Sequence, residues 1–151
     1  MQRSALVERP ATLLFDLIEA AEDYAAFLPW CEGATILERT DEVVSAELRV
    51  RVAGVAFAMR TRNPKRRPEW MAIHLAQGPF RHFEGEWRLR PIGSAGCRID
   101  FRLDYAFDSA TMTRVAGPVF ERIADTLVDA FVQRALSMPM PEPPPSTPGG
   151  A

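Results

Sequence analysis

The sequence is poor in the residue types that build metal sites and disulfide frameworks. Its 151 residues include two cysteines and two histidines, and Cys31 and Cys97 lie too far apart for the close ligand spacing of a zinc site. We therefore expect two free thiols, no metal and no cofactor. No apolar run approaches the roughly 20 residues of a transmembrane helix. Charged residues also interrupt the N-terminal segment, unlike in a signal peptide. These absences predict a cytoplasmic protein.

The composition predicts one folded domain followed by a tail. With 47% hydrophobic and 25% charged residues, the chain is long enough to bury a core of its own. From Ser137 onward, however, proline and glycine dominate, and such a segment has too little apolar surface to offset the entropy lost on ordering. We therefore predict a domain at residues 1–136 and a disordered proline-rich tail at residues 137–151.

Apolar and polar residues alternate along most of the middle of the sequence, which is typical of half-buried strands. The alternation reverses at Ala53-Gly54, as it does in a tight hairpin. The prolines in residues 63–68 predict a loop there. Two short segments with helical spacing, residues 10–21 and 22–28, precede this region. The predicted strands are residues 3–8, 34–39, 46–52, 55–61, 71–75, 83–90 and 97–107.

The longest apolar stripe at helical spacing lies within residues 108–135. Its members are Phe120, Ile123, Ala124, Leu127, Ala130, Phe131 and Ala135, recurring at steps of three and four. Asp108 or Ser109 can cap the start of this helix. Gly117-Pro118 predicts either a kink in one helix or a break between two. The fold class is therefore α+β: a curved antiparallel sheet wraps one long helix, and the wedge between them is either filled or a pocket.

Four segments carry a resemblance to a known family: Phe27-Leu28-Pro29-Trp30-Cys31, residues 78–87 (GPFRHFEGEW), Gly117-Pro118-Val119-Phe120 and Asp129-Ala130-Phe131. In this order and spacing they resemble the signature segments of the coenzyme Q-binding START-like family. That family includes the bacterial ribosome association toxin and belongs to the helix-grip superfamily with polyketide cyclases and lipid-transfer domains. The resemblance spans about residues 2–136.

The resemblance implies a helix-grip fold with the order β-α-α-β-β-β-β-β-β-α around a hydrophobic cavity. It also implies binding of a polyprenyl quinone and a role in respiration. Some bacterial members of the family are instead described as blocking the association of ribosomal subunits.

We predict that inward-facing strand residues and the helix stripe line this cavity. Large aromatic and methionine side chains favour an adaptable cavity, although an ordinary core contains the same residue types. Ubiquinone or a similar isoprenoid quinone is the ligand that the resemblance implies, and the Tyr105 hydroxyl could orient a quinone oxygen. The predicted lining is Trp30, Leu48, Val50, Val52, Phe57, Met59, Met71, Ile73, Leu75, Phe83, Trp87, Leu103, Tyr105, Phe120, Ile123 and Leu127.

A second candidate site is a basic outer face of the sheet. The formal net charge of the chain is −2, yet residues 49–102 contain twelve basic and four acidic residues, a net charge of +8. Such a face could bind RNA phosphates or an anionic membrane, or it could be a solvated face whose charges pair across strands. The predicted basic surface is Arg49, Arg51, Arg60, Arg62, Lys65, Arg66 and Arg67.

The sequence offers little for catalysis. His74 and His82 have the outward parity of their strands, and acid–base chemistry needs groups within hydrogen-bond reach of the reacting atom. We therefore expect a binding protein that sequesters and presents a hydrophobic small molecule, with a cyclase-type enzyme as a weaker alternative. The main alternative is a ribosome-associating protein that interferes with subunit joining through the basic face. The expected location is the cytoplasm, with the periphery of the inner membrane as an alternative; DNA is not expected as a partner.

Overall fold

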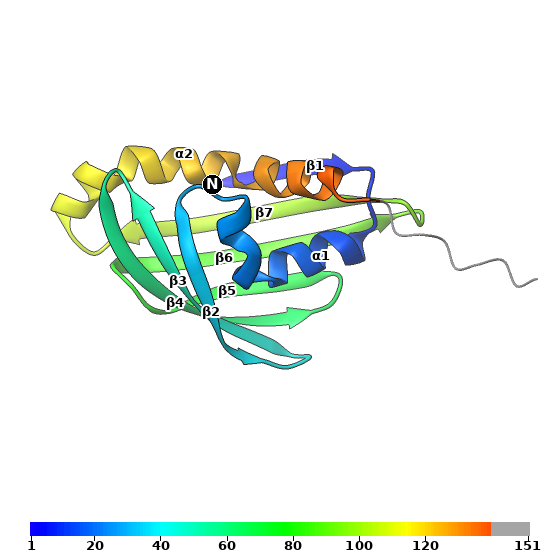
Figure 1. Ribbon diagram of the computed structural model, residues 1–151, viewed down its shortest axis with the longest axis horizontal. Coiled ribbons are helices and arrows are strands. Elements are labelled where there is room, and N and C mark those ends of the chain that lie inside the picture. The colour runs from blue at the N-terminus through cyan, green and yellow to red at the C-terminus, as the bar shows by residue number, and fades with distance from the viewer. Residues whose placement is uncertain (140–151) are drawn as a thin grey trace, which may run out of the picture.

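The computed structural model describes residues 1–139 and contains one curved sheet with three helices. The predicted element order and fold class are confirmed, except that the second short helix is a 3-10 helix, η1 (Figure 1). The elements are β1 (Gln2–Val7), α1 (Ala11–Glu19), η1 (Ala21–Ala26), β2 (Cys31–Arg39), β3 (Val43–Val52), β4 (Val55–Arg66), β5 (Trp70–Gln77), β6 (Phe80–Ile92), β7 (Gly96–Phe107) and α2 (Ala110–Ser137).

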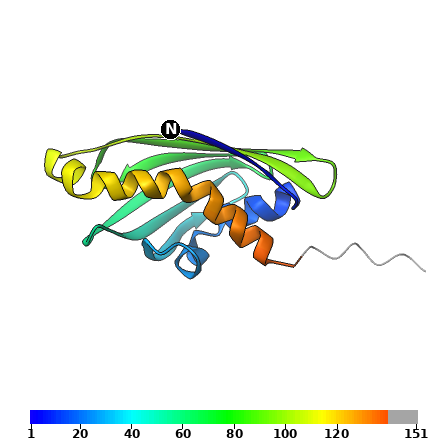
Figure 2. The same ribbon diagram turned by 90° about the horizontal axis from the view of Figure 1, so that it is seen from above.

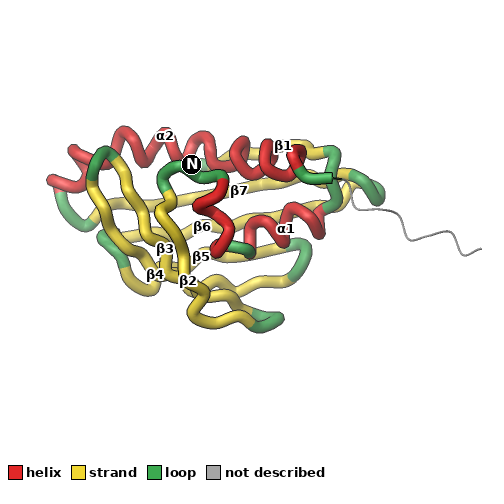
Figure 3. Tube along the Cα trace, viewed as in Figure 1, coloured by secondary structure: helices red, strands yellow, loops and turns green. Residues whose placement is uncertain are grey.

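The seven strands form one sheet in the order β1-β7-β6-β5-β4-β3-β2, and every neighbouring pair is antiparallel. The predicted hairpin joins β3 to β4 through Ala53 and Gly54, whose φ angles are 51° and 79°. Positive φ at both central residues is the type I′ arrangement, which matches the right-handed twist of the flanking strands. Figure 3 shows the helices on one side of the strands, so the sheet has one covered and one open face.

The long helix α2 is continuous from Ala110 to Ser137 and contains Pro118. The Ser109 side chain accepts a hydrogen bond from the Met112 backbone N–H, so Ser109 is the N-cap. The chain therefore forms one helix rather than two segments, and Figure 2 shows that its axis changes direction along its length. Its buried residues are Ala116, Phe120, Ala124, Val128, Phe131 and Ala135.

The loop predicted at residues 63–68 is shorter in the structure: Arg67 and Pro68 lie in the turn between β4 and β5, but residues 63–66 belong to β4. Strand β4 continues to Arg66, and Pro64 lies opposite Val43 of β3. Proline lacks an N–H and is tolerated where the ladder is interrupted; in the described structure neither Asn63 nor Pro64 has a register partner in β5. Because the strand continues, its alternation continues too, and Lys65 joins the inward side.

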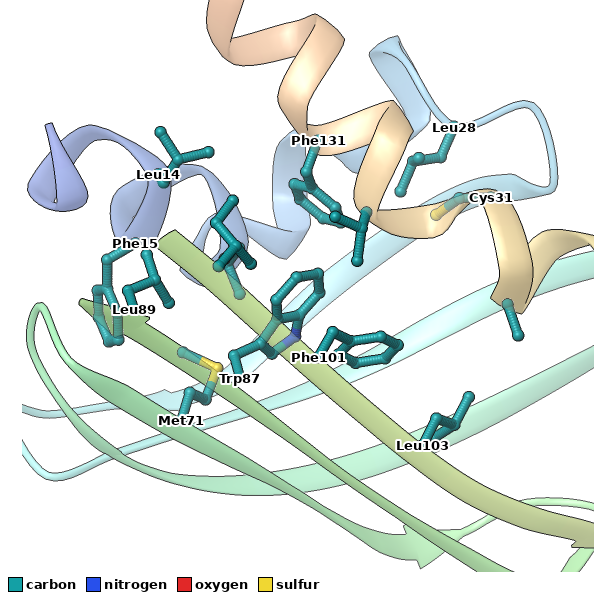
Figure 4. Close-up of a cluster of buried hydrophobic side chains, with 14 of the residues drawn as sticks. Leu14, Phe15, Leu28, Cys31, Met71, Trp87, Leu89, Phe101, Leu103 and Phe131 are labelled. Carbon is teal, nitrogen blue, oxygen red and sulfur yellow. The ribbon is translucent and has the colours of Figure 1, made fainter. Parts of the chain in front are cut away.

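Two groups of aromatic rings hold α2 against the sheet. The first, which we call the Phe131 cluster, consists of Tyr24, Phe27, Trp87, Phe101 and Phe131. The second, the Phe120 cluster, consists of Phe57, Phe80, Phe83, Tyr105, Phe107 and Phe120. Figure 4 shows the Trp87 ring between Phe131 of α2 and Phe101 of β7. Each cluster therefore ties one part of the helix to the sheet.

The predicted domain boundary is close to the end of α2. The helix extends one residue past the predicted boundary at 136, to Ser137, and residues 140–151 of the predicted tail lie outside the described residues. Within residues 1–139, no helix is both long and apolar enough to cross a membrane.

Removing the ring at the centre of the Phe131 cluster should destabilise the domain strongly. Phe131 is 1% exposed, and Phe131→Ala is expected to lower the free energy of unfolding by about 3–5 kcal/mol. The matched control is Leu136→Ala on the same helix, where the side chain is 41% exposed and the change should stay within about 0.5 kcal/mol. Urea unfolding followed by circular dichroism measures both. Equal effects of the two substitutions would contradict the anchoring role of Phe131.

Candidate functional site

A cavity lies between the concave face of the sheet and the helices. It is bounded by α1 and η1 at one end, by inward residues of β3, β4, β5, β6 and β7, and by α2. Its volume is about 110 Å³, below the roughly 300–1,000 Å³ of ordinary small-molecule sites. A ligand larger than a small ring therefore requires the lining to move outward.

Most of the cavity wall is apolar and comes from residues with the predicted inward parity. Eleven of the sixteen predicted lining residues border the cavity; their contact with a ligand stays a prediction. These eleven are Trp30, Leu48, Val50, Met59, Ile73, Phe83, Trp87, Leu103, Phe120, Ile123 and Leu127.

The other five predicted residues do not border the cavity. Met71 lies opposite Trp87 in the β5–β6 register, and Figure 4 shows its side chain below Trp87, near Phe15 of α1. Phe57 contacts Phe80 at 5.9 Å between ring centroids, within the Phe120 cluster. Val52 lies at the β3–β4 hairpin, and Leu75 packs beside Gly78. Alternation places a side chain on one face of the sheet, but it does not give the position along the strand.

Tyr105 is the fifth predicted residue that does not border the cavity. Its ring lies 4.7 Å from that of Phe120, and it borders a shallow hollow on the outside, beside Pro118 and Glu121. Burial and the nearby charges of Glu121 and Asp125 raise the pKa of the Tyr105 hydroxyl. The predicted role in orienting a ligand inside the main cavity therefore does not fit its position.

Eleven further residues line the cavity but were not predicted from the sequence. Some come from the short helices, which alternation along strands cannot reveal; two, Thr61 and Asn63, continue the inward parity of β4. Phe131 and Ala124 were on the predicted helix stripe but were not assigned to the site. The missed residues are Ile18, Glu19, Ala21, Tyr24, Val44, Ala46, Thr61, Asn63, Phe101, Ala124 and Phe131.

The polar groups of the lining gather towards α1 and η1. The Tyr24 hydroxyl donates a hydrogen bond to the carbonyl oxygen of Ile18, and burial raises the pKa of this hydroxyl. Glu19 forms an ion pair with Lys65, and the two side chains are 14% and 6% exposed. Arg39 lies 3.5 Å from the same carboxylate. This end of the cavity therefore contains polar side chains, while the rest is apolar.

Lys65 does not belong to the predicted basic surface, because β4 turns it inward. The remaining six members are exposed, but nearby carboxylates neutralise the charges of several of them. Arg51, Arg60 and Arg67 lie 2.8, 2.9 and 2.7 Å from carboxylates of Glu32, Glu47 and Asp16, and Arg62 lies 4.0 Å from Glu38. Arg49 donates to the Thr35 hydroxyl at 3.1 Å. Much of this surface is therefore a charge-paired face, and its use in binding stays a prediction.

The described residues include few groups suited to catalysis. Cys31 and Cys97 are free and buried, and burial raises the pKa of both thiols, which disfavours the nucleophilic thiolate. His82 lies 3.0 Å from Asp104 on the outer parity of the sheet. Within residues 1–139, no cluster of three or more His, Cys, Asp and Glu side chains could hold a metal ion.

Known proteins resemble this chain over most of its length. The ribosome association toxin RatA of Pseudomonas aeruginosa is 36% identical over 135 residues, which cover 89% of this chain and 94% of the relative. The mitochondrial coenzyme Q-binding protein COQ10 homolog B of Xenopus laevis is 26% identical over 127 residues, which cover 81% of this chain and 52% of that protein.

The fold itself recurs in a solved structure of different sequence. The Zhui aromatase/cyclase from Streptomyces sp. R1128 superposes with a TM-score of 0.76 at 22% identity, covering 90% of this chain and 92% of the other. A family model described as polyketide cyclase / dehydrase and lipid transport matches residues 7–132. Strands β2 to β7, α2 up to residue 132 and every residue that lines the cavity fall inside that match. The chain belongs to this family of START-like helix-grip domains.

Proposed function

We propose that this protein binds a neutral hydrophobic small molecule, an isoprenoid quinone, in the cavity between sheet and α2. The observation that carries the proposal is the apolar cavity itself, which lies between the Phe131 and Phe120 clusters. The protein acts by sequestering the molecule from water and presenting it, without chemical conversion. The name of the COQ10 relative supports a quinone as the ligand.

The span of α2 between the two clusters is the part that can admit a ligand. From Phe120 to Phe131 the helix covers about 16 Å, at 1.5 Å per residue. Within this span Ile123, Ala124 and Leu127 border the cavity, and Ile123 and Leu127 are only half-buried. Trp30, which directly precedes β2, also borders the cavity and is half-buried as well. Moving these side chains outward enlarges the cavity while both aromatic clusters stay packed.

Burial of the ligand tail supplies the binding energy. Each methylene group removed from water contributes about 0.8 kcal/mol, so an isoprenoid chain gains several kcal/mol from even partial burial. The lining is built from aromatic, aliphatic and methionine side chains, and methionine adapts to irregular shapes. Such a wall favours apolar tails without fixing their length.

Ribosome association is the second candidate function, and the identity to RatA favours it. The open face of the sheet carries Arg49, Arg90 and Arg102, which are exposed and form no ion pair within 4.0 Å among the described residues. Phosphate groups could bind there. Because this face is opposite the cavity, both functions are compatible with one fold.

Filling the cavity should abolish quinone binding while the fold survives. Val50 is 2% exposed and borders the cavity, so Val50→Trp places an indole in the ligand space; overpacking costs about 1–3 kcal/mol of stability. Ile92→Trp is the control, because Ile92 is 52% exposed and outside the lining. Fluorescence titration with a short-chain ubiquinone measures affinity, and circular dichroism verifies folding. A folded Val50→Trp protein with unchanged affinity would remove the cavity as the binding site.

Ribosome binding, if the outer face mediates it, should depend steeply on salt. Each phosphate contact contributes about 0.9 to the slope of log affinity against log salt on duplex nucleic acid. Replacing Arg49, Arg90 and Arg102 together by Gln should flatten the slope. The charge-matched control replaces Arg51, Arg60 and Arg88 by Gln, since each of these already pairs with a carboxylate. Co-sedimentation with ribosomal subunits across salt concentrations measures both.

The outcomes separate the two candidate functions. Loss of sedimentation with the first triple variant and retention with the second, at unchanged quinone affinity, would establish the open face as a ribosome-binding surface. If the wild-type protein fails to sediment with subunits even at low salt, the ribosomal function is wrong and quinone binding alone remains.

A further inference from the structure

Strand β4 lines the cavity with a gradient of polarity. Its inward residues, in order, are Met59, Thr61, Asn63 and Lys65, so the inward side of the strand changes from apolar to hydroxyl, amide and ammonium over about 20 Å at 3.3 Å per residue. Met59, Thr61 and Asn63 all border the cavity. The polar end therefore lies beside α1, on the same wall as the apolar part.

The Asn63 side chain has hydrogen-bonding capacity that the protein does not use. Its Oδ1 atom is buried without a partner in the described structure, and its Nδ2 atom has only the Met71 sulfur, at 3.9 Å. Sulfur is a weak acceptor, and an unsatisfied buried amide destabilises the fold. An amide can present oxygen or nitrogen by rotating, because the two ends have nearly the same shape. It can therefore meet either a carbonyl or a hydroxyl of a ligand.

The charges behind Asn63 cancel one another. Lys65 pairs with Glu19, whose carboxylate is also 3.5 Å from Arg39, and Arg39 in turn lies 2.8 Å from Glu22. Two acids and two bases therefore form one chain of ion pairs at the α1 end. A charged head group would have to displace one of these partners, and breaking a buried pair is costly. The end of the cavity accordingly favours a polar but neutral group.

We infer that the Thr61–Asn63 end of the cavity is the head-group subsite, where a neutral oxygen-bearing ring hydrogen-bonds to the Asn63 amide while its apolar tail runs along Met59 and Phe83 towards α2. This inference rests on the proposed function and adds the orientation of the ligand. It assigns the selection of the head group to β4 and places the tail under the span of α2 between Phe120 and Phe131.

The test compares a ligand that has a head group with one that lacks it. Short-chain ubiquinone and squalene, an isoprenoid hydrocarbon without a polar head, are titrated into the wild-type protein and into Asn63→Leu. The variant should bind the quinone about fivefold to tenfold more weakly, because one hydrogen bond is lost, and should bind squalene as well as wild type does. Met59→Leu, a volume-conserving change on the same strand, should alter both affinities equally.

Thermal unfolding of the ligand-free proteins gives a second, independent readout. Asn63→Leu removes an unsatisfied buried amide, so its melting temperature should rise by about 2–4 °C, whereas an asparagine that only stabilises the fold would lower it when replaced. Thr61→Val removes the neighbouring hydroxyl at constant shape and should also weaken quinone binding selectively. This second variant tests the subsite if Asn63→Leu fails to fold.

The result also distinguishes this inference from the proposed function. If wild type binds both ligands and neither variant discriminates between them, the cavity binds hydrophobic molecules but the head group lies elsewhere. If wild type binds neither ligand, the proposed function fails, and the subsite fails with it.

Discussion

The structure depends on the packing of one helix against the sheet at two separate places. The Phe131 and Phe120 clusters each combine aromatic rings of α2 with rings from the strands, and such pairs add about 0.5–1.5 kcal/mol beyond the area they bury. Because the two clusters lie at different positions along α2, the part of the helix between them can pack less tightly while the helix stays attached to the sheet. The cavity lies under this intermediate span, so the same arrangement explains both a stable fold and a space inside it.

The polar end of the cavity shows a conflict between stability and binding. A domain selected only for stability would place an apolar residue at position 63, where the Asn63 oxygen is buried without a partner. Natural proteins accept such local costs at functional sites and offset them elsewhere. Here the offset is available from the aromatic clusters and from the chain of ion pairs that fastens α1 to β2 and β4.

The sequence predicts the order of elements well because alternation and helical spacing are local signals. It predicts the β3–β4 hairpin because the reversal of parity at Ala53-Gly54 has one simple geometric cause. It fails at residues 63–66, where Pro64 indicates a loop although this proline is accommodated in β4. This error removed Asn63 and Lys65 from the predicted interior. Tyr105 and Met71 show the other limit: parity gives the face of a sheet, whereas the distance along a twisted strand to the cavity depends on long-range packing.

The pairing of β1 with β7 determines when the domain can become complete. Gln2 lies opposite Arg102, so β1, which precedes the other strands of the sheet in the sequence, pairs with β7, which follows them. At about 5–20 residues per second, this partner follows on the order of 5–20 s later. During that time the apolar face of α1, with Leu14, Phe15 and Ile18, has no finished sheet to cover it. Contacts this distant in sequence also slow folding itself. In the nascent chain, the apolar face of α1 therefore stays exposed to solvent until almost the whole domain has left the ribosome.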